Sequence, residues 1–559
     1  MLTFGIFSDL HNSKGDFENV INNIYELSNN GKSLDSLIMV GDIVYLPTSE
    51  SMPSAQTYAM INSNERLQEL KSSGRLIFAM GNHEFPLHNM KPEVCDLAKR
   101  VFREETGLTP ENVTVIDGYH FITAGPYSYA NDLSKEQEDF IIESVTKALN
   151  ADPVKPVFLF VHEPVDNTLY GSEPYDFYSE RLESFLKHEP RLVMFSGHMH
   201  FPSSDPQTIL QIPGGTTFVY TSSIMGGNGA KTPYTTDRHR NWPCQAIMMN
   251  VDTDTNKVTI KRFYVSASSP KYLEGGDWVL DIPAMIGERG KENPDTSIYK
   301  YTNKRRELSS PPYFADGDRI EVRSVSETGA TLFLPTPRQS AEGEDSVGAY
   351  YIAELFNKTE GRLEKTSKML TDYFIENKSD YFKYNISNLT PATNWSIKIT
   401  PVTPWYVEGT NSVTVDFSTL APRFEDAEFD DDGTFVYNIS ADAKFNGDRT
   451  NYGNFVMIAG GWETEFEFTA ELEKAGKYRA FLSSASVGNA SFVGAVFDNN
   501  GKELAKGDNI IITGGYTNFK EAPLVDVDIK EKGIYTFKFV TPVCDDTISI
   551  KDFILKKHK

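Results

Sequence analysis

Five short segments rich in Asp, Asn and His follow predicted strands between the start of the chain and residue 200. They are residues 8–11 (Ser-Asp-Leu-His), 41–42 (Gly-Asp), 81–84 (Gly-Asn-His-Glu), 161–162 (Val-His) and 197–200 (Gly-His-Met-His). A lone Asp-x-His or His-x-His often occurs by chance, whereas five such segments in this order within about 190 residues form a joint signal. Together they supply the ligands needed to hold two metal ions about 3.5–4 Å apart.

Up to residue 268, apolar runs alternate with amphipathic segments. The apolar runs at residues 3–8, 36–40, 76–80, 113–116, 157–161 and 192–196 suit strands that are buried on both faces. Helices are expected over residues 16–27, 56–70, 92–105 and 135–149, and further strands over 209–212, 217–222, 246–251 and 258–264. The pattern predicts an α/β sandwich for residues 1–268, with two mixed sheets flanked by helices.

The rest of the chain has a different pattern. Residues 269–310 show weak periodicity and are predicted to form an extended connector. Short alternating strands then dominate, which predicts two all-β sandwich domains over residues 311–421 and 422–559. The corner before Trp395 resembles that of a fibronectin type III domain, with Trp395 in place of the usual tyrosine. The last domain resembles a jelly roll of the kind found in carbohydrate-binding modules.

The five metal-binding segments resemble the signature of the calcineurin-like metallophosphoesterase family. The resemblance implies that Asp9, His11 and His200 hold a first metal, that Asp42 bridges the pair, and that Asn82, His162 and His198 complete the second. Carboxylate, amide and imidazole ligands suit two divalent or mixed-valence ions such as Mn, Fe or Zn. His198 and His200 are expected to lie on extended backbone, where alternate side chains point the same way.

The same resemblance implies a reaction. A hydroxide that bridges the two metals would attack phosphorus in a small phosphate ester, and His83 would act as the general acid at the leaving-group oxygen. Both a phosphomonoesterase and a phosphodiesterase fit this description. An alternative of another class is a surface adhesin or glycan-binding protein whose phosphatase-like domain is a scaffold.

Tyr45 bears on the subclass. Residues 41–45, Gly-Asp-Ile-Val-Tyr, match a segment of purple acid phosphatases in which the tyrosine ligates ferric iron. Those enzymes usually carry Asp-x-Gly at the first motif, whereas this chain has His11 there. An imidazole from His11 would take the coordination position of the tyrosine. We therefore expect Tyr45 to be a core residue or a support behind the ligands, without a tyrosinate absorption band.

Two loops are candidates for the substrate pocket. Residues 167–176 follow His162 and contain Tyr170, and residues 226–244 contain Tyr234, Arg238 and His239. A basic and aromatic loop in an acidic chain could bind a phosphate and stack on a base or sugar ring. The simpler interpretation is a solvated loop with packing aromatics.

Charge and hydropathy limit the partners. The net charge of −24 argues against binding to a nucleic-acid duplex, which needs clustered Lys and Arg. No run of about 18 apolar residues occurs, so no membrane span is expected. Met1 leads directly into a predicted strand, and we find no export signal in the chain. The β modules resemble those of exported proteins, which favours an extracellular or cell-surface location, with a glycan or cell-surface ligand, over the cytoplasm.

Overall fold

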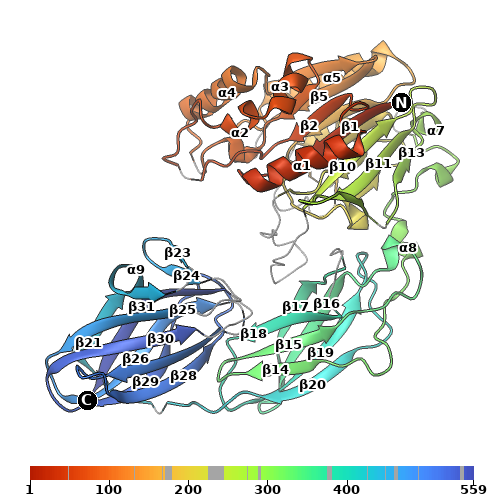
Figure 1. Ribbon diagram of the computed structural model, residues 1–559. Helices are drawn as coiled ribbons and strands as arrows, with labels where there is room; N and C mark the ends of the chain where they lie inside the picture. Colours follow the sequence, from red (N-terminus) through yellow and green to blue (C-terminus); the bar gives the residue numbers. More distant parts are fainter. Residues whose placement is uncertain are drawn as a thin grey trace.

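The computed structural model describes residues 1–559 except positions 48, 88, 131–132, 167, 170–178, 225–243, 274, 287–290, 374–379, 425, 447–448, 459–463, 487, 489 and 542–546. Figure 1 shows an α/β region that holds the N-terminus, a first β-sandwich, and a second β-sandwich that contains the C-terminus. Among the described residues, no helix is long and apolar enough to cross a membrane.

Two mixed sheets form the α/β region, which confirms the predicted fold class. The first has the order β12-β11-β10-β1-β2-β3, with β13 paired to β11, and the second has the order β4-β5-β6-β7-β9-β8. The strands of the first sheet are β1 (Leu2–Phe7), β2 (Ser36–Val40), β3 (Leu76–Ala79), β10 (Gln245–Val251), β11 (Val258–Tyr264), β12 (Lys271–Tyr272) and β13 (Trp278–Leu280). Those of the second are β4 (Asn112–Ile116), β5 (Tyr119–Ala124), β6 (Val157–Val161), β7 (Leu192–Ser196), β8 (Ile209–Gln211) and β9 (Thr217–Tyr220).

An apolar core lies between the two sheets. Phe4 of β1 packs on Phe121 of β5 with ring centroids 4.7 Å apart, and Phe160 of β6 stacks on Phe195 of β7 at 5.2 Å. The strands β2, β6 and β7 are buried along their whole length. Because both faces of these strands are covered, their sequences are continuous apolar runs.

Helices cover the outer faces of both sheets (Figure 1). They are α1 (Lys14–Leu27), α2 (Ala59–Asn62), α3 (Glu65–Ser72), α4 (Pro92–Thr106), α5 (Lys135–Ala151) and α6 (Glu180–Leu186). The single helix predicted over residues 56–70 is wrong, since α2 and α3 replace it. The Asn64 side chain caps α3 by accepting a hydrogen bond from the Leu67 amide at 3.2 Å. A capping residue takes up extended backbone, so the helical path is interrupted there.

The segment predicted as a connector takes part in the first sheet. Besides β12 and β13, it contains α7 (Ile282–Met285) and α8 (Arg305–Leu308). Trp278 of β13 is buried in the core between the sheets, and β13 pairs with β11. A strand of three residues is too short for a periodic pattern, so only its tertiary pairing defines it.

The first β-sandwich packs two antiparallel sheets on a core that contains Leu332, Tyr351 and Trp395. One sheet consists of β14 (Glu321–Val325), β15 (Gly329–Pro335) and β18 (Tyr381–Ser387). The other consists of β16 (Tyr350–Asn357), β17 (Arg362–Leu370), β19 (Asn394–Val402) and β20 (Val413–Ser418). The edge strand β17 was not expected, because most of its side chains are polar and exposed.

The second β-sandwich also has two sheets, in the orders β23-β24-β31-β26-β29, with β21 paired to β31, and β22-β25-β30-β27-β28. Its elements are β21 (Phe429–Asn438), α9 (Ile439–Asp442), β22 (Lys444–Asn446), β23 (Thr450–Asn451), β24 (Val456–Ile458), β25 (Thr464–Leu472), β26 (Gly476–Ser486), β27 (Ala490–Phe497), β28 (Glu503–Ile511), β29 (Lys520–Ile529), β30 (Gly533–Thr541) and β31 (Ile548–His558). Phe468, Phe537 and Phe553 form the centre of its core.

Buried ion pairs join the α/β region to the first β-sandwich. The Glu344 carboxylate lies 3.1 Å from Nη1 of Arg262 and 2.6 Å from Nη2 of Arg305. Asp345 accepts from the Trp405 indole at 2.7 Å and pairs with Arg305 at 2.9 Å. The Arg262 and Arg305 side chains are almost inaccessible to solvent, so their charges depend on these carboxylates.

We predict that Glu344→Ala lowers the free energy of unfolding by about 3 kcal/mol, because it leaves two buried guanidinium groups without their shared partner. Urea denaturation measures this change. The matched control is Asp416→Asn, which breaks an exposed pair with Lys358 and should cost less than about 1 kcal/mol. Equal effects of the two substitutions would contradict the structural importance of the Glu344 pairs.

Candidate metal centre

The predicted metal-binding segments meet where β1, β2, β3, β6 and β7 end. Backbone hydrogen bonds join the segments to each other: the Asp9 amide donates to the Gly41 carbonyl at 3.1 Å, and the Gly197 amide donates to the His162 carbonyl at 2.8 Å. The parallel strands within each sheet place their carboxyl ends at the same edge. The two sheets together therefore bring residues from distant parts of the chain to one place.

The backbone of these segments is unusual. Five of the predicted ligands have positive φ angles, namely Asp9 (55°), His11 (50°), Asp42 (53°), His198 (70°) and His200 (54°). The expectation that His198 and His200 lie on extended backbone is therefore wrong, since both lie in a left-handed turn after β7. Such conformations cost about 1–3 kcal/mol each and are concentrated at functional sites, where the surrounding structure holds them in place.

Two glycines allow the segments to approach closely. A Cβ atom on Gly41, which has a φ of 78°, would lie 2.5 Å from the His162 ring. A Cβ atom on Gly197 would lie 2.6 Å from Oδ2 of Asp9 and 2.6 Å from Oγ of Ser8. Any side chain at either position would displace a predicted ligand.

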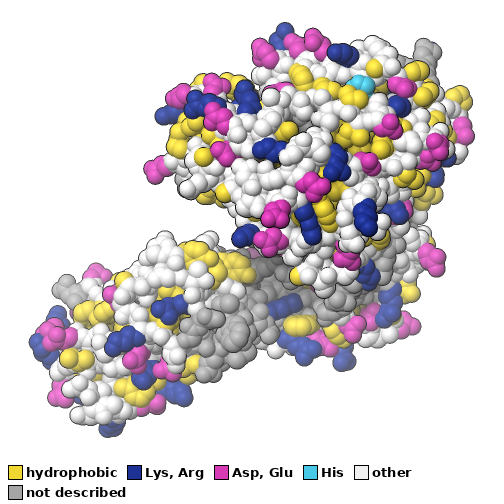
Figure 2. Space-filling model, turned by 45° about the horizontal axis from the view of Figure 1, so that its top comes forward, with side chains coloured by type: hydrophobic (Ala, Val, Ile, Leu, Met, Phe, Trp, Pro, Cys, Tyr) yellow, Lys and Arg dark blue, Asp and Glu magenta, His cyan; other side chains and the backbone are white. Residues whose placement is uncertain are grey.

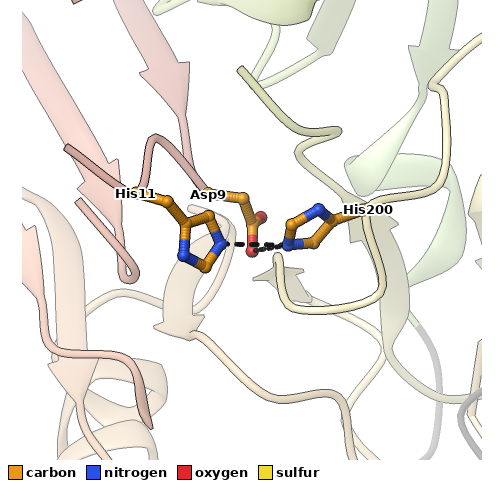
Figure 3. Close-up of side chains that lie close together, drawn as sticks. All are labelled: Asp9, His11 and His200. Atoms are coloured by element: carbon orange, nitrogen blue, oxygen red, sulfur yellow. Dashed lines mark hydrogen bonds and ion pairs between the residues drawn. The ribbon is translucent and has the colours of Figure 1, made fainter. Parts of the chain in front are cut away.

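Asp9, His11 and His200 form the first cluster. Figure 3 shows the two imidazole rings facing each other beside the Asp9 carboxylate. Nε2 of His11 lies 3.1 Å from Nε2 of His200, which in turn lies 3.2 Å from Oδ1 of Asp9. Ser8 helps to position the carboxylate, because its hydroxyl donates to Asp9 Oδ2. Three ligand atoms are thus gathered as a single cation requires.

Asp42, His162 and His198 form the second cluster. Nε2 of His162 lies 3.0 Å from Oδ2 of Asp42, and Nδ1 of His198 lies 3.2 Å from Oδ1 of Asn82. Nδ1 of His162 is 2.7 Å from the Val40 carbonyl, which assigns its proton to that bond and leaves Nε2 as a lone-pair donor. Nε2 is buried, and it lies within 4 Å of carboxylate oxygens of Asp42 and Asp9. A buried ring nitrogen close to two carboxylates fits a metal ligand.

Asp42 lies between the clusters. Its Oδ2 is 3.7 Å from Nε2 of His11 and 3.0 Å from Nε2 of His162, while its Oδ1 accepts from the His83 amide at 2.8 Å. Asp42 also forms a third group with His11 and His83. The Asp42 carboxylate is therefore in reach of ligand atoms from both clusters, as the predicted bridging role requires. Asp9 of the first cluster also comes within 3.7 Å of Nε2 of His162.

Burial and charge set the protonation of the cluster. Burial lowers the pKa of His198 to about 3 and that of His11 to about 4, so both imidazoles are neutral at physiological pH. Burial acts against the charged form of Asp42, but His162 and His83 outweigh it and hold its pKa well below the usual value. Burial lowers the pKa of His162 as well, but Asp42 and Asp9 outweigh it and raise that pKa well above the usual value. A cation bound by Nε2 of His162 would therefore displace a proton, as metal ligands generally require.

Glu84 holds two of the segments together. It ends the short 3₁₀ helix η1 (Asn82–Glu84) and is buried. Its carboxylate accepts hydrogen bonds from the backbone amides of Asp42 at 2.9 Å, Ile43 at 2.8 Å and Val44 at 3.2 Å, and also from that of Gly81. The structure shows that it fixes the turn after β2 against the turn after β3.

Sequence motifs did not identify every residue beside the clusters, and the predicted substrate residues cannot be placed. Tyr129, which lies beside His83 at 5.4 Å between ring centroids, was missed because no motif surrounds it. Glu163 is buried next to His162, and burial raises its pKa to about 8. The predicted substrate residues Tyr170, Tyr234, Arg238 and His239 lie outside the described residues, so their position relative to the clusters stays a prediction.

The sequence of this region matches a known family. Residues 2–202 match the family model described as calcineurin-like phosphoesterase. The matched segment contains every predicted ligand from Asp9 to His200. Residues 2–202 are thus similar in sequence to calcineurin-like phosphoesterases. No curated protein matches the chain significantly.

Several carbohydrate-binding modules are similar to part of the chain. The C-terminal CBM6 of LamC from Zobellia galactanivorans is 15% identical, with a TM-score of 0.19, over 22% of this chain and 99% of that module. A family 35 module from Clostridium thermocellum is 17% identical, with a TM-score of 0.18, over 22% of this chain and 96% of the module.

We predict that Gly197→Ala reduces the amount of metal bound by the purified protein, because the new methyl group displaces the Asp9 carboxylate. Elemental analysis and the melting temperature measure the effect. Gly15→Ala in α1 is the matched control, since a Cβ atom there meets nothing within 4 Å and alanine favours a helix by about 1 kcal/mol over glycine. Unchanged metal content in Gly197→Ala would contradict the close approach of Gly197 to the site.

Proposed function

We propose that the α/β region hydrolyses phosphate esters with the help of two metal ions. The observation that carries this proposal is the position of the Asp42 carboxylate between two clusters of imidazole and carboxylate ligands. The match to the calcineurin-like phosphoesterase model over residues 2–202 supports the same reaction class. Both phosphomonoesters and phosphodiesters are candidate substrates.

In this proposal, Asp9, His11 and His200 hold one metal, Asn82, His162 and His198 hold the other, and Asp42 bridges them. When bound, such metals lower the pKa of water and neutralise charge on the phosphate. The donor set fits Mn, Fe or Zn. The surrounding residues hold the ligands at fixed positions. Ser8 bonds to Asp9, the Val40 carbonyl bonds to His162, and Glu84 bonds to the Asp42 amide.

His83 is the proposed proton donor to the leaving group. Its backbone amide is fixed by Asp42, and its ring lies 4.8 Å from that of His11. The side chain therefore stands at the border of the metal clusters without belonging to the predicted ligand set. A general acid at this place would protonate the oxygen that departs from phosphorus.

Local capture of the substrate is expected because the protein as a whole is acidic. The net charge of −24 repels anions at long range. Figure 2 shows the basic and acidic side chains of the described residues interspersed over the visible face. The attraction for a phosphate is therefore expected to come from the metal centre itself.

The alternative of an adhesin or glycan-binding protein with an inactive scaffold predicts no hydrolysis by the metal-loaded protein. The convergence of the predicted ligands argues against it, because a scaffold has no need of strained left-handed turns at these positions. A glycan or cell-surface ligand for the β-sandwiches and a location outside the cell stay predictions. An upstream export signal in the full reading frame would support that location.

We predict that Asp42→Asn and His83→Ala each lower kcat by about 100-fold or more, as expected for a bridging ligand and a general acid. Asp42→Asn should also lower the metal content, whereas His83→Ala should not. The assay is a panel of phosphomonoesters and phosphodiesters with the purified protein and measured metal content. Near-normal hydrolysis by Asp42→Asn would contradict the two-metal proposal.

Removal of the metals should abolish hydrolysis and lower the melting temperature. A ligand that binds only the folded state stabilises it by about 2.7 kcal/mol at a concentration 100 times its Kd. Dialysis against a chelator followed by addition of Mn, Fe or Zn one at a time identifies the metals that restore both properties. If chelated protein retains full activity and its melting temperature, the site does not bind catalytic metals.

A further inference from the structure

Three aromatic rings surround the imidazole of His83. Tyr45 stacks on it with centroids 4.8 Å apart and planes inclined by 30°. Tyr129 meets it edge-on at 5.4 Å and 83°, and His11 lies at 4.8 Å and 76°. The Tyr45 ring therefore covers a face of the imidazole, the Tyr129 ring stands nearly perpendicular to it, and both contacts oppose rotation of the His83 side chain.

His83 differs from His162 in how its orientation is fixed. Nδ1 of His162 bonds to the Val40 carbonyl at 2.7 Å, which is the common way to fix a functional imidazole. Nδ1 of His83 is buried and has no hydrogen-bond partner among the described residues. The direction in which the His83 ring points therefore depends on the rings that pack against it.

The main chain holds Tyr45 against His83. The Asn12 side-chain amide donates to the Tyr45 carbonyl at 2.9 Å. The next residue, Leu46, donates its amide to the His83 carbonyl at 3.2 Å. The backbones that carry the two stacked rings are thus bonded to each other, and the Tyr45 ring also contacts His11 at 5.6 Å. The stacking geometry is built into the turn after β2.

Tyr129 reaches His83 from the other sheet. It follows β5 of the second sheet, is partly buried, and packs against the core cluster under the helices of the first sheet. Its ring is nearly perpendicular to that of His83, whereas the Tyr45 ring is stacked on it. Two independent elements of the fold therefore meet at one imidazole.

We propose that Tyr45 and Tyr129 are positioning residues that aim the His83 imidazole at the leaving-group oxygen. This inference rests on the proposed hydrolysis and goes beyond it, because it assigns the orientation of the proton donor to two ring contacts instead of a hydrogen bond. A tyrosine that works through its ring can be replaced by phenylalanine. A tyrosine that binds substrate or metal through its hydroxyl cannot.

The test compares two esters of the class that the protein hydrolyses, one with an alkyl alcohol and one with 2,4-dinitrophenol as leaving group. Only the alkyl alcohol needs a proton to depart. Tyr45→Leu should lower kcat for the alkyl ester by about 10- to 100-fold, a part of the 10²–10⁴ that a general acid supplies. It should change kcat for the dinitrophenyl ester by less than about threefold, since proton donation contributes little there. Tyr45→Phe should retain most of the kcat that Tyr45→Leu loses, because it keeps the aromatic ring.

A double-mutant cycle with His83→Ala separates positioning from general damage to the fold. If Tyr45 acts through His83, Tyr45→Leu has no further effect on the alkyl ester once His83 is replaced. Tyr129→Leu should give the same leaving-group dependence and replaces Tyr45→Leu if that variant fails to fold. Tyr127→Leu is the matched control, because Tyr127 lies close by in sequence but packs under Lys99.

Five results would overturn the inference. An equal loss for both esters, or a loss of bound metal, would show that Tyr45 acts through His11. A failure of Tyr45→Phe to restore activity would assign the role to the hydroxyl. Additive losses in the cycle would show an effect independent of His83. If His83→Ala lowers kcat equally for the alkyl and the dinitrophenyl ester, the acid role in the proposed function fails. The positioning role then fails with it.

Discussion

The rest of the site depends on the contacts of one buried carboxylate, that of Asp42. One of its oxygens is in reach of imidazoles from both clusters, and the other accepts the amide of His83. An ionised group without solvent needs such partners, because burial of an unpaired charge is strongly unfavourable. The same partners define where cations can bind. Charge compensation and metal binding are thus two aspects of a single arrangement at the end of β2.

The turns around Asp42 are held in conformations that isolated peptides avoid. Asp9, His11 and Asp42 adopt left-handed backbone, and the four amide bonds to Glu84 lock the turn after β2 to the turn after β3. Strain of this kind persists only where the surrounding fold determines it. The aromatic core between the sheets provides that rigidity, since β1, β2 and β6 each pack on it immediately before their ligands.

Attachment of the first β-sandwich extends this rigid unit. Tyr350, Leu370 and Val402 of the sandwich belong to the same apolar cluster as Leu182 and Leu186 of α6. The Glu344 pairs with Arg262 and Arg305 lie at the same junction. An interface that combines a shared apolar cluster with buried ion pairs does not act as a flexible linker. The first β-sandwich is therefore joined directly to the region that carries the metal centre.

The sequence by itself determined which buried strands precede the predicted ligands, because apolar runs are local properties. It also identified the predicted ligands, through the resemblance of five short segments to a known family. Asp9, His11, Asp42, Asn82, His162, His198 and His200 could all be named in this way. The tertiary structure alone decided how the side chains of the site are oriented and what surrounds them. The left-handed turn at His198 and His200, the strand around Trp278 and the approach of Tyr129 to His83 each depend on contacts between residues far apart in the chain. Local periodicity carries no information about such contacts, because they form only when the two sheets pack together.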